Sequence, residues 1–155
     1  MYHFLQQDYD ALVRKKVSLI LELRTSGQDI GEAGQQSSET WHDNAPLEVA
    51  QREFERLHKR LEEIDKIVQG AEIVQVETVA TTCAGIGSEV TFRNQDGKEQ
   101  TVKIGSYVPE EGSISVSYVA PIAKMLLGAH VGDIVEGKVA GRDVELEIMK
   151  IARWI

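Results

Sequence analysis

The stretch VSYVAPIAKMLLGAHVGD, residues 116–133, decides the fold of the second half of this 155-residue chain. Apolar residues alternate with serines up to Tyr118, which is typical of a half-buried strand. Pro121 then suits the first turn of a short helix, and Gly128 suits its end. Gly132 begins a turn with the aspartate that follows it. The stretch therefore predicts a strand, a short helix and a turn in succession.

The residues around this stretch predict further strands. Residues 134–139 and 144–151 are rich in β-branched side chains and lie on either side of Gly141-Arg142-Asp143, so we expect a hairpin there. Upstream, Asn94-Gln95-Asp96-Gly97 favours a tight turn between two strands, which are residues 87–93 and 99–104. A short helix with these strands makes an α+β domain built on a small antiparallel sheet.

The first half has a different composition, with dense charge and few β-branched residues before Gly70. Apolar residues recur there at alternating steps of three and four, as in the seam of a coiled coil. They are Leu47, Ala50, Phe54, Leu57, Leu61, Ile64 and Val68. Gly70 follows the last of them and suits a helix end. This pattern predicts a long helix that needs an apolar partner.

An earlier segment offers that partner, although Lys16 and Ser26 interrupt its rhythm. Its seam residues are Leu5, Tyr9, Leu12, Leu19, Leu23, Ile30 and Ala33. Two such helices joined by the polar residues 35–45 are expected to pack as an antiparallel hairpin. The predicted division is therefore a coiled-coil hairpin over residues 1–75 and a second domain over residues 76–155. The pattern leaves a dimerisation stalk open, but one chain can satisfy its own seam, so we expect a monomer.

Composition narrows the classes of function. The formal net charge of −8 and the pI near 5 argue against a protein that wraps nucleic acid by itself, although they would speed entry into a basic cavity. Cys83 is the single cysteine, so we expect a reduced thiol and no internal disulfide. Neither a signal-peptide pattern nor a long apolar run is apparent, and we expect a cytoplasmic protein without membrane contact.

Residues 85–151 resemble the C-terminal domain of the bacterial Gre transcript-cleavage factors. Three blocks keep the mutual spacing of the family's motif: Pro121-Ile122-Ala123-Lys124, Leu126-Leu127-Gly128 and Val131-Gly132-Asp133. The resemblance implies an FKBP-like fold for the second domain and bacterial RNA polymerase as the partner. It also implies that the helical hairpin enters the secondary channel of the polymerase. The residues it assigns to polymerase docking are Pro121, Ile122, Ala123 and Lys124.

The hairpin tip is similar to the family's tip motif at Asn44-Ala45. On that comparison Asp43 matches the second acid of the motif, whereas Thr40 stands at the first acid and Glu39 lies next to it. In the family, two tip carboxylates help to hold a second Mg²⁺ ion near the polymerase's own, and the ions activate water for in-line attack on a phosphodiester of backtracked RNA. The resemblance thus makes Asp43 and Glu39 the candidate catalytic and metal-binding residues. The protein would stimulate the polymerase's own RNA hydrolysis and would not be an enzyme itself.

The tip residues also allow structural interpretations. Asp43 and Asn44 fit a helix N-cap ahead of Pro46, and Glu39 fits a solvated loop acid. Trp41 either packs on the end of the hairpin or offers an aromatic anchor to the polymerase. The chemistry of the tip is therefore open on sequence grounds.

Three functions follow from these alternatives. The first is a cleavage-stimulating elongation factor, and the second is a non-cleaving regulator or inhibitor of RNA polymerase, which the threonine at position 40 favours. The third is an FKBP-like prolyl isomerase or chaperone. That activity requires an apolar, aromatic-lined pocket. The second half has few aromatic residues to line one, which disfavours this function: they are Phe92, Tyr107, Tyr118 and Trp154.

Overall fold

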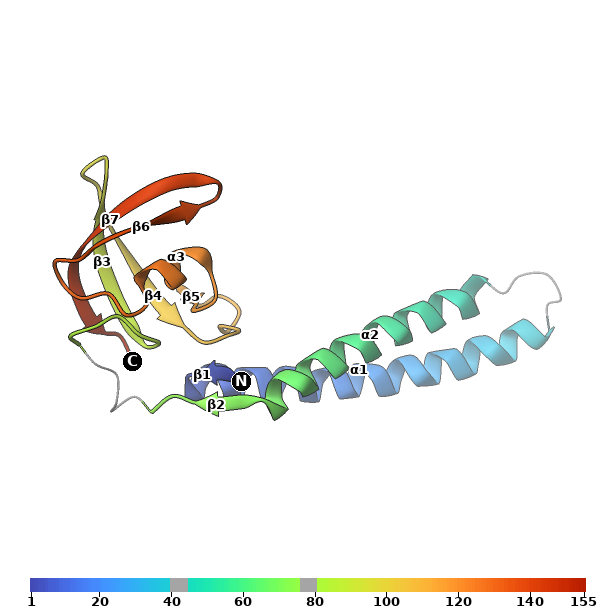
Figure 1. Ribbon diagram of the computed structural model, residues 1–155. Helices are drawn as coiled ribbons and strands as arrows, with labels where there is room; N and C mark the ends of the chain where they lie inside the picture. The colour runs from blue at the N-terminus through green and yellow to red at the C-terminus, as the bar shows by residue number, and fades with distance from the viewer. Residues whose placement is uncertain (40–44, 76–80) are drawn as a thin grey trace. The chain divides into compact units, whose positions relative to one another are not determined.

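The computed structural model describes residues 1–39, 45–75 and 81–155, and the side chains of residues 36–39 and of Pro46 also lie outside the description. The described chain forms two compact units (Figure 1). Unit 1 comprises Met1–Tyr9 and Ala71–Ile155, and unit 2 comprises Asp10–Gly70. The first nine residues thus group with the C-terminal part of the chain, whereas the sequence pattern had assigned them to the hairpin.

Two long helices make the hairpin, α1 (Gln6–Glu39) and α2 (Ala45–Gln69), and they run side by side (Figure 1). The predicted helical hairpin is confirmed. Of the predicted seam residues in unit 2, the buried ones are Leu12, Leu19, Leu57 and Ile64, and Ser26, which interrupts the seam, is buried as well. Helix α1 continues through residues 35–39, which the sequence pattern placed in the connection. Glutamine and glutamate have good helix propensity, which explains the extension.

The charged residue that interrupts the first seam has a partner on the facing helix. Lys16 Nζ lies 2.7 Å from Asp65 Oδ1, and about a third of each side chain is exposed, 33% and 36%. The aliphatic part of a lysine side chain can lie along an apolar surface while its ammonium group reaches polar surroundings. The interruption is therefore an ion pair between α1 and α2.

Unit 1 begins with a two-stranded parallel sheet of β1 (Tyr2–Phe4) and β2 (Ala71–Ile73). Tyr2 pairs with Ala71 and Phe4 with Ile73. Phe4 is fully buried, at 0% exposure. The sequence did not predict β1, because three residues are too few to show a period. Residues 72–79 were expected to leave the helix as an extended segment, and β2 overlaps the start of that segment.

The main sheet of unit 1 has five strands in the order β5-β4-β3-β7-β6 (Figure 1). Their bounds are β3 (Ser88–Asn94), β4 (Glu99–Gly105), β5 (Ser115–Ser117), β6 (Ile134–Val139) and β7 (Arg142–Arg153). Strand β5 pairs parallel with β4, and the other neighbours are antiparallel. The α+β class is confirmed, but the sheet is mixed and not purely antiparallel. Residues 106–114 connect β4 to β5, so the two strands are not joined by a tight hairpin turn and can run in the same direction.

The short helix α3 (Pro121–Leu126) packs on this sheet. Alternate residues of the central strands face it and fill the core with α3 side chains. The buried cluster includes Val90, Phe92, Ile104, Ala123, Leu126, Leu146 and Ile148. Packing of Ala123 and Leu126 in this core therefore holds α3 on the sheet.

The β6–β7 turn lies one residue earlier than the sequence suggested. Its central residues are Ala140, with φ of 51°, and Gly141, with φ of 79°. Positive φ at both central positions is the geometry of a type I′ turn, which matches the twist of a hairpin. Arg142 and Asp143, expected in the turn, already belong to β7.

Candidate functional site

Helix α3 carries the predicted docking residues, and the turn before it is held by Ser117. The Ser117 hydroxyl donates to the Tyr107 carbonyl oxygen at 2.7 Å, and the Ala120 amide donates to the Ser117 carbonyl oxygen at 2.9 Å. Ala120 is the N-cap residue in an extended conformation, with no side-chain cap. Pro121 follows in the first turn, where its missing N–H costs nothing. The start of α3 is thus fixed by the Ser117 side chain and by a backbone hydrogen bond.

The end of α3 is fixed in the same way. The Leu127 amide donates to the Ala123 carbonyl oxygen at 2.9 Å. Gly128 then takes a positive φ of 80°, which reverses the chain. Its amide donates to the Ala84 carbonyl oxygen at 2.8 Å, and the Ala84 amide donates to the Ala129 carbonyl oxygen at 2.8 Å. These bonds join the helix end to a segment that is distant in sequence.

The four predicted docking residues differ in exposure. Pro121 and Lys124 are exposed, and Ile122 is half-buried against the core. Ala123 is fully buried, at 0% exposure, so its side chain cannot contact a partner. The prediction for Ala123 is therefore corrected: it is a core residue that holds α3 on the sheet. The surface consists of the exposed residues on the other side of the helix.

Close packing against β6 also positions α3. A Cβ atom at Gly137 would lie 2.8 Å from the Met125 sulfur, closer than real Cβ contacts allow. Glycine at this position therefore leaves room for the Met125 side chain against β6. Large apolar side chains stay exposed just before and after α3, at Val119 (37%), Val131 (55%) and Ile134 (61%). Exposed apolar residues beside a rigid helix suit a protein-binding surface better than a catalytic site.

A buried aspartate that the sequence did not single out organises the N-terminal segment of unit 1. Asp8 is 2% exposed. Its carboxylate accepts a hydrogen bond from the Ser106 hydroxyl at 2.5 Å and another from the Glu110 amide at 2.9 Å. The Leu5 amide donates to the same Ser106 hydroxyl at 2.8 Å. The one sequence signal was an acid in a first helical turn, which by itself indicates only a favourable interaction with the helix dipole.

Two of the tyrosines of the second half contact the N-terminal strand. The Tyr107 ring lies 4.5 Å from the Tyr2 ring between centroids, and the Tyr118 ring lies 5.8 Å from the His3 ring. The Tyr107 amide donates to the His3 carbonyl oxygen at 3.0 Å. These rings pack on residues of the same chain, which does not favour their use as the lining of a peptide pocket.

Charged side chains on the outside of α2 form local pairs. Arg56 donates to both oxygens of Glu53, at 2.6 and 2.9 Å. These hydrogen bonds, with the attraction of the guanidinium, hold the pKa of the Glu53 carboxyl below its ordinary value. The same hydrogen bond and attraction raise the pKa of Arg56. Both groups are solvent-exposed, so the pair contributes little to stability.

The predicted catalytic tip is placed only in part. Trp41 and Asp43 lie outside the described residues. Glu39 is the last residue of α1, and its side chain lies outside the description. Among the residues that the structure describes, no group of three histidine, cysteine or acidic side chains could hold a metal ion. The assignment of Asp43 and Glu39 to a Mg²⁺ site therefore stays a prediction.

Comparisons with known proteins place the chain in a family. Residues 79–153 match the model for the C-terminal domain of the transcription elongation factors GreA and GreB. Transcription elongation factor GreA of Thermotoga neapolitana is 29% identical over 154 residues, which cover 97% of this chain and 92% of that protein. GreA of Mycoplasmopsis pulmonis is 33% identical over 110 residues, covering 70% of this chain and 68% of its own.

Solved structures of the same group are also similar. The GreA factor homolog Gfh1 of Thermus thermophilus is 22% identical with a TM-score of 0.43, and 97% of each chain is covered. None of the helices in the described part of the chain is long and apolar enough to cross a membrane. The sequence relationships confirm the resemblance found in the motifs: this chain is a transcription elongation factor and belongs to the GreA/GreB family.

Proposed function

We propose that the protein binds bacterial RNA polymerase in the cytoplasm, inserts its helical hairpin into the secondary channel and modulates the active site there. Membership of the GreA/GreB family carries this proposal. The dimensions of the hairpin support it. Helix α2 has 25 residues, and at 1.5 Å per residue it is about 37 Å long. A hairpin of this length separates its tip from its own base by about that distance.

The exposed side of α3 is the proposed docking surface of unit 1. Pro121 and Lys124 are open to solvent, and Ile122 contributes the exposed part of its side chain. A rigid helix that loses little conformational entropy on binding is a suitable platform for such a contact. We assign Trp41 the corresponding contact at the tip, inside the channel.

At the active site we propose weak or no stimulation of RNA cleavage, together with competition against cleavage-active factors for the same channel. The observation that favours this function is Thr40, which stands where the family motif has its first acid. Mg²⁺ in proteins commonly binds through one or two carboxylates. Asp43 and Glu39 are the residues that would hold the ion, and it would generate and orient the attacking water. Loss of one well-placed carboxylate weakens that arrangement.

A stalled, backtracked elongation complex tests both parts of the proposal. We expect the protein to co-purify with the polymerase, to shorten the RNA weakly or not at all, and to slow the cleavage stimulated by an active factor. Thr40→Asp should raise cleavage, and Asp43→Asn should abolish any cleavage without loss of binding. Strong Mg²⁺-dependent shortening by the unmodified protein would return the cleavage-stimulating function to first place. Absence of polymerase binding would refute the proposal as a whole.

A further inference from the structure

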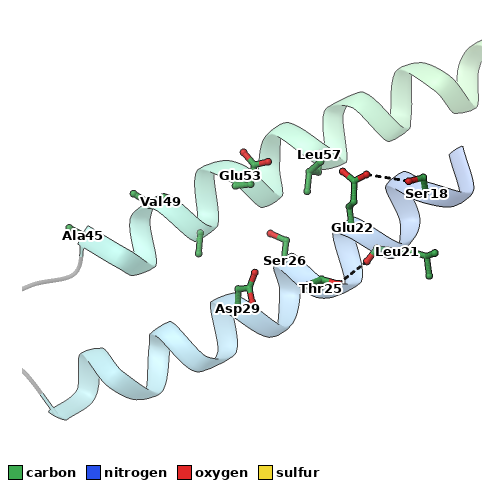
Figure 2. A pocket seen from close by; sticks show the side chains of 11 residues that line it. Ser18, Leu21, Glu22, Thr25, Ser26, Asp29, Ala45, Val49, Glu53 and Leu57 are labelled. Carbon is green, nitrogen blue, oxygen red and sulfur yellow. Dashed lines mark hydrogen bonds between the residues drawn. The ribbon is translucent and has the colours of Figure 1, made fainter. Parts of the chain in front are cut away.

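A cleft of about 950 Å³ lies between α1 and α2 within unit 2. Its apolar lining comes from both helices and includes Leu21 on α1 with Val49, Ala50 and Leu57 on α2. Figure 2 shows Ser26 projecting from α1 toward α2, and Leu57 projecting from α2 toward α1. The cleft belongs to the hairpin and is separate from the α3 surface, which lies in unit 1.

Small residues in the seam account for the cleft. Ser26 occupies a seam position of α1 and is buried, and Ala50 occupies a seam position of α2. Large apolar side chains normally fill such positions in a two-helix coiled coil. Side chains this short leave unfilled space between the helices, with Leu57 buried beside it. An interior normally packs without such space, so the hairpin lacks an apolar side chain here that another polypeptide could supply.

The margins of the cleft expose large apolar side chains. Leu21 is 57% exposed and Val49 is 64% exposed, although each lines the cleft. Apolar residues gathered along one side of a hairpin are typical of a contact surface for another chain.

The charges at the cleft select what can bind. Glu22, Asp29 and Glu53 line it, and among its lining residues in the described part of the chain none is basic. Arg56, one turn beyond Glu53 on α2, already pairs with that carboxylate. Nucleic acid is disfavoured by three carboxylates, and a second copy seated face to face would bring the same acids together. A positively charged polypeptide is favoured.

We propose that this cleft binds one amphipathic α-helix of a partner protein, with apolar residues at heptad spacing and lysine or arginine on both flanks. The cleft runs from Ser18 to Asp29 along α1, about 16 Å or three helical turns at 1.5 Å per residue. Apolar side chains of the bound helix replace those missing at Ser26 and Ala50, and its cations pair with Glu22 and Asp29. This activity goes beyond polymerase docking through α3 and does not depend on it.

Synthetic helices test the proposal on the full-length protein. The first probe is a fluorescent peptide of about three heptads, with leucine at the seam positions and lysine on the flanks. The second has glutamate in place of every lysine, and the third has the composition of the first in an order without helical period. We expect the first probe to bind at least about tenfold more tightly than either of the others by fluorescence anisotropy.

Two matched pairs of substitutions locate the binding. The double variant Glu22→Gln, Asp29→Asn removes two carboxylates from the cleft and should weaken binding of the basic probe about tenfold, with a shallower salt dependence. Glu62→Gln, Glu63→Gln removes the same charge from exposed positions of α2 outside the cleft and should leave binding within about twofold. Val49→Glu should also abolish binding, whereas Val131→Glu in unit 1 should not.

Each of the following results would contradict the proposal. Equal binding of the ordered and disordered basic probes would show attraction of charge alone, and equal binding of the acidic probe would remove the charge selection. Binding that survives Val49→Glu, with an unchanged helical circular dichroism signal, would place the contact elsewhere. A stable dimer at micromolar concentration that Val49→Glu dissociates would identify a second copy as the occupant. Because the probes contain no polymerase, these outcomes are independent of polymerase binding.

Discussion

In unit 1 the buried polar side chains of Asp8, Ser88 and Ser106 each take part in a hydrogen bond, whereas the seam of unit 2 buries Ser26 beside an open cleft. The β domain therefore uses buried polarity to fix one arrangement. In the hairpin, small residues in the seam instead leave an unfilled cleft, and carboxylates line that cleft. The difference indicates that buried polar groups specify one arrangement in unit 1, whereas the distal hairpin leaves a cleft for which we propose a helical partner.

The largest stability effect should come from breaking the buried network of unit 1. Asp8→Ala leaves the Ser106 hydroxyl and the Glu110 amide without their acceptor. A buried polar group left unsatisfied costs about 1–3 kcal/mol, so the free energy of unfolding should fall by that amount. Urea denaturation followed by Trp154 fluorescence measures it in a Trp41→Phe background. Ser18→Ala, which removes an exposed hydrogen bond in the hairpin, is the control. Equal effects of the two changes would mean that unit 1 does not depend on this network.

A charge reversal on the exposed side of α3 should weaken binding to RNA polymerase without lowering the free energy of unfolding. Lys124→Glu reverses an exposed charge, and we expect polymerase binding to weaken about tenfold, or about 1.4 kcal/mol. Ile122 is a poorer choice for this test, because it is half-buried and a charge there would disturb the core. Pull-down titration gives the affinity, and Lys98→Glu, on the exposed β3–β4 turn, is the matched control. Unchanged affinity would exclude this side of α3 as the docking surface.

Filling the hairpin seam should raise the free energy of unfolding rather than lower it. Ser26→Leu adds apolar volume at the cleft, and we expect the free energy of unfolding to rise by about 1 kcal/mol. The same change should abolish binding of the basic helical probe, since the space that receives it is filled. Gln28→Leu, at an exposed position of α1, should have neither effect. A loss of stability in Ser26→Leu would show that the space cannot accept a leucine.

A smaller gain is expected at the β6–β7 turn. Ala140 adopts a positive φ that strains an alanine, and asparagine followed by glycine is the preferred pair in a type I′ turn. Ala140→Asn should raise the free energy of unfolding of unit 1 by about 0.5–1 kcal/mol. Thermal melting of unit 1 measures the gain. Ala140→Val, which is β-branched, should destabilise the same turn, and a neutral result for both would exclude strain there.

The sequence predicted the elements whose signal is local. A heptad seam is visible over many residues, and the ends of α3 follow from Pro121 and Gly128, so both were predicted correctly. The alternation of apolar residues and serines also predicted β5, although not its parallel pairing with β4. Strand β1 has three residues, too few to show a period, and it pairs with a partner distant in the chain. The role of Asp8 depends on Ser106, which is 98 residues away in the chain. Burial of Ala123 could not be predicted from its motif, because a shared motif contains core and contact residues alike.

The smallest effect should come from the exposed pair of Glu53 and Arg56, although Arg56 donates to both carboxylate oxygens of Glu53. Its hydrogen bonds lower the pKa of Glu53, so the stabilisation is present above the ordinary range of a glutamate carboxyl. That stabilisation is lost as the pH falls through the lowered pKa, because the protonated carboxyl no longer pairs with the guanidinium. Both side chains are open to water, which screens the attraction, so Glu53→Gln should leave the melting temperature at pH 7 almost unchanged. Melting curves at pH 7 and pH 3 test this, with Glu63→Gln as the control for loss of a negative charge. A large loss at pH 7 in Glu53→Gln alone would mean that the pair holds α2 in its position along the cleft, and the hairpin would then be as firmly specified as the β domain.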